Sequence, residues 1–284
     1  MKFRHLMIPL LVTAATRAWG GDLPTVAGPA MGATYRVTLA RDLPGMSLGE
    51  VHREVERVLA RLDRALSTWR PDSDASRFNR SPAGEWIDVA PDLAAIVAVA
   101  RRVHRDTDGA FDITAGAGRI GAMCHLESRV TPPALRKIRA DVVVDLGGIG
   151  PGYAVDRIGE QLQELGSSSH LVELGGEVRA WGERVAGEPW RVVLRHTGES
   201  IRLAAGEALA TSTARAGRSP IDPRTGRVVA PAVPVATVRA ATCAEADAWA
   251  VAVLVLGGMP DGVNRVSEAP SMRAGPTAAR QEDP

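Results

Sequence analysis

The sequence contains little cysteine and almost no net charge. Its two cysteines, Cys124 and Cys243, allow at most one disulfide, and neither has the spacing of a metal-binding pair. The 34 basic and 33 acidic residues give a net charge of +1, and the two signs are interspersed along the chain. Nucleic-acid-binding proteins carry a basic patch or stripe. We therefore expect no nucleic acid or other polyanion as a partner.

Long apolar runs are also missing. The run from Leu6 to Ala15 is too short for a permanent membrane anchor. It follows the basic residues Lys2 and Arg4 and precedes small residues that end at Gly20, a pattern typical of a secretory signal peptide. We expect residues 1–20 to be removed from an exported or periplasmic protein, with a buried first helix as the alternative. No cysteine lies beside the cleavage site, which argues against a lipoprotein.

Helical and strand patterns are both present, which predicts a mixed α and β fold. Ser47 and Glu50 form a capping box before an apolar periodicity that ends at Leu66. Further helices are predicted from Asp92 to about Gly109, through residues 154–165, and over residues 244–256. Strands are predicted at residues 35–39, 142–146, 170–174, 178–181, 191–195, 201–204, 208–211 and 236–240. The strands of the second half are expected to be antiparallel.

The periodicity is interrupted at two places. Glycine-rich sequence and Pro132-Pro133 mark residues 116–140 as the region where any domain boundary would fall. From residue 259 the chain is rich in proline, alanine and glycine with scattered charge, and no strand pattern is visible. This composition predicts a folded domain over residues 21–258 and a poorly ordered tail over residues 259–284.

A glycine-rich stretch, "DLGGIGPGYAVD" at residues 145–156, follows the predicted strand 142–146. Glycines after a strand let the backbone approach a ligand, and the N–H groups of the next helix can hold phosphate oxygens. The glycine spacing fails the dinucleotide-binding fingerprint, and no P-loop motif is present. A structural turn is the ordinary interpretation. Asp145 favours a site, because a carboxylate after an apolar strand is costly unless it is paired or faces a ligand.

Four other polar stretches have a structural and a functional interpretation. Asp112 in "GAFDITAG" can form an Asx turn or contact a ligand, and Trp69 can pack normally or stack on a planar ring. The turn "SPIDPRTGR" needs no function, although Arg218 and Arg224 could face phosphates. Acidic residues that open the helix 244–256 usually complement its dipole, so a metal role for Asp247 is the less common case.

Seven stretches taken in order resemble the FAD:protein FMN transferases, the ApbE-like family, over residues 30–258. They are "MGATYRVTL", "LSTWRPDSDASRFN", "GAFDITAG", "VDLGGIGPGYAVDRI", "LVELGGEVRAWG", "ATSTARAGRSPIDPRTG" and "AEADAWAVAVLVLG". The resemblance implies an α/β fold, with mixed and antiparallel sheets flanked by helices and a cleft for the flavin. It also implies an Mg²⁺-dependent transfer of FMN from FAD to a Thr or Ser hydroxyl of an exported or membrane-bound redox protein, with release of AMP.

The resemblance also implies which residues form the site. The positions that match FAD contacts are Met31, Trp69, Ala110, Phe111, Asp112, Asp145 and Ile221. The positions that match metal ligands are the carbonyl of Gly148, the side chain of Asp247, and Ala250, which can offer only its carbonyl. Oxygen donors of this kind suit Mg²⁺.

Three residues depart from the family pattern. Pro151 stands where the family has Lys, Val251 where it has a Thr metal ligand, and Ser219 where it has a His. A transferase of this sequence would use Arg218 or Arg224 for the missing positive charge, and Asp222 or a water to accept the proton. The alternatives are a non-catalytic FAD-binding or assembly protein and an Mg²⁺-dependent FAD pyrophosphatase.

Overall fold

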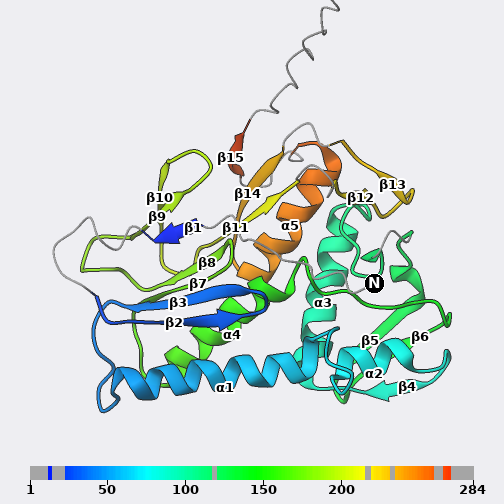
Figure 1. The fold of residues 1–284 in the computed structure, drawn as a ribbon, viewed down its shortest axis with the longest axis horizontal. Helices are drawn as coiled ribbons and strands as arrows, with labels where there is room; N and C mark the ends of the chain where they lie inside the picture. The colour runs from blue at the N-terminus through cyan, green and yellow to red at the C-terminus, as the bar shows by residue number, and fades with distance from the viewer. Residues whose placement is uncertain are drawn as a thin grey trace, which may run out of the picture.

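A seven-stranded sheet organises the fold (Figure 1). The computed structural model describes residues 12–14, 23–116, 120–214, 219–230, 234–258 and 265–269. In spatial order the strands are β15 (Arg265–Ala269), β14 (Val235–Ala240), β11 (Ala208–Thr213), β8 (Glu177–Trp181), β7 (His170–Leu174), β3 (Ala33–Leu39) and β2 (Thr25–Ala30). Every neighbouring pair is antiparallel.

Three smaller sheets complete the described strands. The first joins β1 (Val12–Ala14), β9 (Trp190–Leu194) and β10 (Ser200–Leu203), and the second joins β4 (Trp86–Asp88), β6 (Pro133–Lys137) and β5 (Leu126–Val130). The third is the hairpin of β12 (Ile221–Asp222) and β13 (Arg227–Val228). All described strand pairs are antiparallel, so the mixed α and β class is confirmed without a parallel pair in these residues.

Both faces of the central strands are buried. In β8, Val178 and Ala180 pack with β9 and β10, while Trp181 belongs to the larger core on the opposite face. That larger core is covered by α1 (Leu48–Leu66), α4 (Gly150–Glu164) and α5 (Cys243–Leu256). Alternate residues of a strand point to opposite faces. Burial on both sides therefore explains why nearly every residue of β7 and β8 is buried, including the polar His170, Glu173 and Glu177.

The predicted helices are confirmed, with shifts of a few residues at their ends. Ser47 and Glu50 form the predicted capping box of α1, and Gly166 follows α4 with a φ of 93°. The helix predicted from Asp92 is α3 (Pro91–Asp106), which ends three residues before Gly109. The short helices α2 (Asp74–Arg80) and η2 (Met123–His125) were not predicted. Neither is long enough to show a helical periodicity.

The predicted strand at residues 142–146 is wrong, because this segment pairs with no strand. The backbone of this segment is hydrogen-bonded to the side chains of Asn79 and Lys137 and to the Ile113 carbonyl in place of a β-ladder. The Asn79 amide donates to the Val144 carbonyl (2.9 Å) and accepts from the Val144 N–H (2.7 Å). The buried Lys137 ammonium donates to the carbonyls of Asn79 and Val142. An apolar run in the sequence does not show whether its backbone N–H and C=O groups will pair with another strand or with side chains.

The segment after residue 258 contains a strand that the sequence did not predict. Residues of β15 pair with β14 and lengthen the main sheet, which corrects the expectation of a tail without a strand. The rest of that tail, most of the expected signal peptide and Arg218 lie outside the described residues. Cys124 is exposed and Cys243 is buried, and both are free thiols. No helix among the described residues is long and apolar enough to cross a membrane.

A buried histidine joins α4 to the central sheet. The His170 ring stacks on Trp181 with 4.8 Å between ring centroids. Its Nε2 lies 3.1 Å from the Gly159 carbonyl, which can only accept, so Nε2 carries the proton and Nδ1 accepts from the Ser167 hydroxyl. Burial lowers the pKa of His170 to about 4. The neutral ring is therefore the form that the fold requires.

We predict that His170 makes the protein sensitive to acid. Its pKa is depressed in the folded state, so its contribution is complete above pH 6.5 and is lost as the pH falls toward 4. Between pH 7 and pH 5 the wild type should lose about 2 kcal/mol more unfolding free energy than His170→Gln. Urea denaturation of both proteins at the two pH values measures this difference. Equal losses in the two proteins would contradict the prediction.

Candidate functional site

Two aspartates cap each other's helices where α4 meets α5. Asp247 of α5 accepts a hydrogen bond from the Gly152 N–H in the first turn of α4 (3.1 Å). Asp156 of α4 accepts from the N–H groups of Cys243 and Ala244 at the start of α5 (2.9 Å each). The first N–H groups of a helix have no partner within it. Each carboxylate supplies that partner and fixes one helix against the other.

The contact between the two helices is close. A side chain at Gly152 would collide with the carbonyl of Cys243 and with Asp247. The first turn of α4 also contains Pro151, which is suited to this position because it needs no N–H partner there. Glycine and proline thus bring the first turn of α4 directly against α5.

The interface is rich in buried carboxylates. Burial raises the pKa of Asp247 to about 7. Burial and the charge of Asp247 together raise the pKa of Glu177 in β8 well above its usual range. Asp156 pairs with Arg179 (2.7 Å), although burial still raises the pKa of Asp156. Arg179 is already paired with Asp156 and does not pair with Asp247. A further cation near Asp247 would therefore be favourable.

The turn before α4 lies beside this interface. The position of a Cβ on Gly148 is 3.0 Å from a methyl group of Val251 and 3.6 Å from the Phe111 ring. Gly148, Phe111 and Val251 are therefore neighbours. Val251 offers a methyl group where an oxygen ligand was expected. Ala250 is buried on α5 next to it.

Asp145 lies at the surface on the same side. Its carboxylate accepts from the Gly147 N–H (2.9 Å), and its own N–H donates to the Ile113 carbonyl (2.7 Å). Its side chain contacts Gly116, where no Cβ would fit. The loop 109–116 and the turn 145–148 are thus held together, and Asp145 remains exposed.

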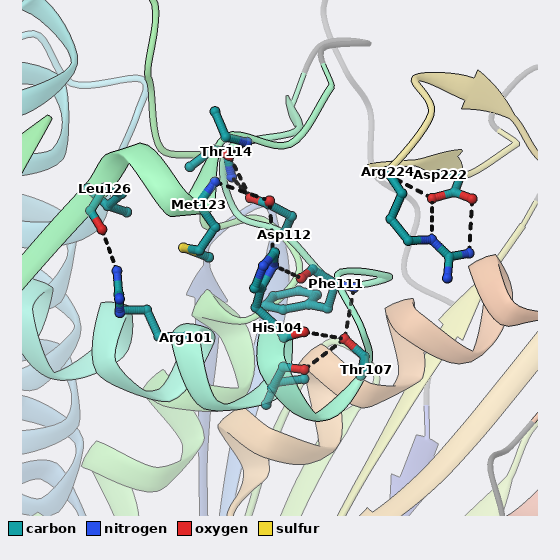
Figure 2. Close-up of polar contacts among 12 residues, drawn as sticks. Arg101, His104, Thr107, Phe111, Asp112, Thr114, Met123, Leu126, Asp222 and Arg224 are labelled. Atoms are coloured by element: carbon teal, nitrogen blue, oxygen red, sulfur yellow. Dashed lines mark hydrogen bonds and ion pairs between the residues drawn. The ribbon is translucent and has the colours of Figure 1, made fainter. Parts of the chain in front are cut away.

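Asp112 forms the Asx turn that its sequence allowed. Its carboxylate is 2% exposed. It accepts from the N–H and hydroxyl of Thr114 (2.7 and 2.6 Å) and from the Met123 N–H (3.4 Å), as Figure 2 shows. Its neighbours Ala110 and Phe111 are also buried. Because this carboxylate is engaged inside the protein, a ligand contact here would come from the backbone.

The β12–β13 hairpin carries an internal ion pair. Arg224 binds Asp222 through both ends of its guanidinium (2.9 and 3.0 Å). The Pro223 carbonyl accepts from the Gly121 N–H (2.7 Å), which fixes the hairpin to the loop of Asp112. The hydrogen bonds from Arg224 lower the pKa of Asp222. Asp222 is therefore a weak proton acceptor, and half-buried Ile221 lies on the same short strand.

Two other predicted flavin contacts are exposed. Met31 is 36% exposed and Trp69 is 80% exposed. Met31 and Gly32 form the turn between β2 and β3 with φ angles of 47° and 77°, a conformation that glycine tolerates and methionine rarely adopts. Strained residues of this kind often mark binding sites. The exposed side chains of Met31 and Trp69 can reach a ligand without rearrangement of the core.

The structure places Asp247 against the first turn of α4 and Val251 beside Gly148, but it forms no dense metal cluster in the described residues. Among the described residues no group of three or more His, Cys, Asp or Glu side chains could hold a metal ion. The remaining donors are oxygens, namely the buried Asp247 carboxylate and the carbonyls of Gly148 and Ala250. An all-oxygen set completed by water fits Mg²⁺. The high pKa of Asp247 fits as well, because a bound cation would favour its charged form.

Sequence reasoning missed the residues that support the site. Asn79, Asp156 and Glu177 lie inside three of the quoted motifs, but none of them was predicted as a site residue. A carboxylate at an otherwise buried helix position, such as Asp156, was the signal that could have been used. A cavity of about 620 Å³ elsewhere, lined by Arg41, Ser169 and Arg184 among others, contains none of the predicted site residues.

Comparisons with known proteins find relatives similar in sequence and fold. A FAD:protein FMN transferase of Haemophilus influenzae is 29% identical, with 82% of this chain and 80% of that protein covered. The Escherichia coli K12 FAD:protein FMN transferase is 28% identical, with 83% and 79% covered. The apo structure of the Pseudomonas stutzeri flavinyl transferase ApbE has a TM-score of 0.75 at 30% identity, with 84% and 87% covered.

A second solved structure, the flavin transferase ApbE of Vibrio cholerae, has a TM-score of 0.73 at 29% identity, with 83% of this chain and 87% of that chain covered. A family model described as the ApbE family matches residues 31–273. Because this match spans most of the sequence and the fold agrees with it, the chain belongs to the ApbE family.

Proposed function

We propose that the protein is an FAD:protein FMN transferase, which attaches FMN from FAD to a Thr or Ser hydroxyl of a target protein and releases AMP. The observation that carries the proposal is the joint of α4 and α5, where the buried Asp247 lies against the first turn of α4. The relatives that share this fold are named for the same activity. The expected target is an exported or membrane-bound redox protein, in keeping with the predicted signal peptide.

The reaction is a phosphoryl-type transfer, which depends on positioning and on neutralising phosphate charge. The glycines of the turn before α4 have no side chains, so the backbone there can approach a pyrophosphate closely. Asp247 and the carbonyls of Gly148 and Ala250 would hold Mg²⁺, which supplies charge neutralisation when bound. Exposed Met31 and Trp69 offer apolar and aromatic surface for the isoalloxazine ring.

The departures at Pro151, Ser219 and Val251 favour a second candidate, a protein that binds FAD without transferring FMN. The structure strengthens this alternative in one respect, because Arg224 already neutralises Asp222. Hydrolysis of FAD to FMN and AMP is a third outcome, in which water replaces the acceptor hydroxyl. The water could complete the metal shell beside Val251, so that departure is the easiest to tolerate.

We predict that incubation with FAD, Mg²⁺ and an acceptor domain adds the mass of one FMN to the acceptor. Asp247→Asn should reduce the rate at least about 100-fold, the scale expected when one transition-state contact is removed. Mass spectrometry of the acceptor and chromatographic detection of AMP measure the two products. Arg195→Gln, in the exposed turn between β9 and β10, is the control and should retain the wild-type rate.

Tight FAD binding without an adduct or AMP would support the non-catalytic alternative, and AMP release without an acceptor would support hydrolysis. Absence of FAD binding would contradict all three. A gain of activity in the double variant Pro151→Lys, Ser219→His would indicate that the site is intact and lacks only these groups.

Mg²⁺ binding should weaken as the pH falls. Asp247 has a pKa of about 7, so below that pH a proton must leave before the cation can bind. Between pH 8 and pH 6 the Mg²⁺ affinity should fall by up to about tenfold per pH unit below 7. Isothermal titration calorimetry with MgCl₂ measures the affinity. Asp247→Asn should bind weakly at every pH, and a pH-independent wild-type affinity would count against this ligand.

A further inference from the structure

A histidine near the end of α3, His104, lies against the buried Asp112 carboxylate described above. Its Nδ1 lies 3.0 Å from the Phe111 carbonyl oxygen and 3.5 Å from Oδ2 of Asp112 (Figure 2). Both neighbours are acceptors, because one is a carbonyl and the other a carboxylate. The proton must therefore lie on Nδ1, which leaves a lone pair on Nε2.

The frame around this histidine is rigid. Asp112 is fixed by Thr114 and Met123, and Thr107 accepts a hydrogen bond from the Phe111 N–H (3.2 Å). Thr107 itself donates to the Val103 carbonyl on α3 (2.7 Å). The two acceptors that face Nδ1 are thus held from both sides. An acid that orients an imidazole through Nδ1 is the arrangement that prepares Nε2 as a base.

The other edge of the ring faces outward. The His104 side chain is 30% exposed, and no hydrogen bond to Nε2 is present among the described residues. Gly109 has no side chain, and its Cβ position would lie 3.6 Å from Cε1 of His104 and 3.3 Å from Cγ of Arg224. His104 therefore lies beside the β12–β13 hairpin, and the Phe111 ring leads from it to Gly148.

We propose that His104 is the base of the transfer reaction, an inference that rests on the proposed function. The acceptor hydroxyl oxygen attacks the phosphorus of the FMN half of FAD, and its proton passes to Nε2 of His104. The bond from that phosphorus to the bridging oxygen breaks, and the electron pair leaves with AMP. No oxidant or reductant is involved. His104 then returns the proton to solvent or to the leaving phosphate.

Charged groups approach His104 from the turn and loop after α3, from the β12–β13 hairpin and from α5. Asp112 approaches from the loop after α3, and Arg224 approaches from the hairpin with its charge paired to Asp222. From α5, which packs on α3, Glu245 is paired with Arg102. Asp112 lies on the Nδ1 side, and Asp108 in the turn after α3 lies close enough to Arg224 to interact with its charge. A carboxylate on the Nδ1 side would stabilise the imidazolium that forms when Nε2 accepts the proton.

The simpler interpretation is that His104 only complements the dipole at the end of α3 and closes the following turn. His104→Asn separates the two, because the asparagine amide can still donate toward the Phe111 carbonyl but provides no group at the Nε2 position. His196→Asn, in the loop between β9 and β10, is a matched control.

The experiment measures single-turnover FMN transfer from FAD to an acceptor domain between pH 5.5 and pH 9, with FAD affinity and thermal stability measured on the same proteins. We expect His104→Asn to lower the rate about 10²- to 10⁴-fold with FAD affinity within about threefold of wild type. The rate of the wild type should rise with pH along a limb that the variant lacks. His196→Asn should match the wild type.

A transfer rate within threefold of wild type in His104→Asn, with an unchanged pH profile, would overturn the role of His104 and leave the proposed function standing. No adduct from the wild type would overturn both. Should the variant unfold, diethyl pyrocarbonate on the wild type replaces it. Loss of transfer in proportion to modification of His104, located by peptide mass, supports the proposal, and full activity after its modification refutes it.

Discussion

The reciprocal capping of α4 by Asp247 and of α5 by Asp156 is the constraint on which the rest of the site depends. Capping bonds of this kind contribute about 1 kcal/mol each. Their larger effect is geometric, because they fix where two helices meet. That joint sets the position of the turn before α4, and the turn in turn packs against Phe111. The central sheet supplies the floor, with Arg179 of β8 balancing the charge of Asp156.

The loops around this joint are fixed by side chains rather than by strands. Asn79 pairs with the backbone of Val144, and Lys137 binds two carbonyls nearby although it is almost fully buried. Burial lowers the pKa of Lys137, a sign that its charge is held at some expense. Removing either residue would leave buried backbone groups without partners. Asn79 and Lys137 would destabilise an apolar core if they had no partners. Here their hydrogen bonds define the shape of the site.

The sequence predicts much of the fold but less of the site. The capping box at Ser47 and the apolar periodicity of α1 and α5 are local, so both helices could be predicted. The strand expected at residues 142–146 could not be separated from a clamped loop, because its partner Asn79 is 65 residues away in sequence. Motif order pointed to Asp247 and Gly148. It could not reveal that the Asp112 carboxylate is hydrogen-bonded within its own turn. It also could not reveal that Asp156 caps α5 or that Nδ1 of His104 faces the Phe111 carbonyl.

Reciprocal capping also bears on when the protein acquires its site during synthesis. The bonds that join α4 to α5 connect residues 87, 88 and 95 positions apart. Contacts between distant residues form late, because the intervening chain must first be brought together. The first turn of α4 therefore gains its partner only after α5 has been made and has docked. A nascent chain that ends before α5 would contain most of the motifs that the resemblance predicts to contact FAD and still lack a joint to hold them.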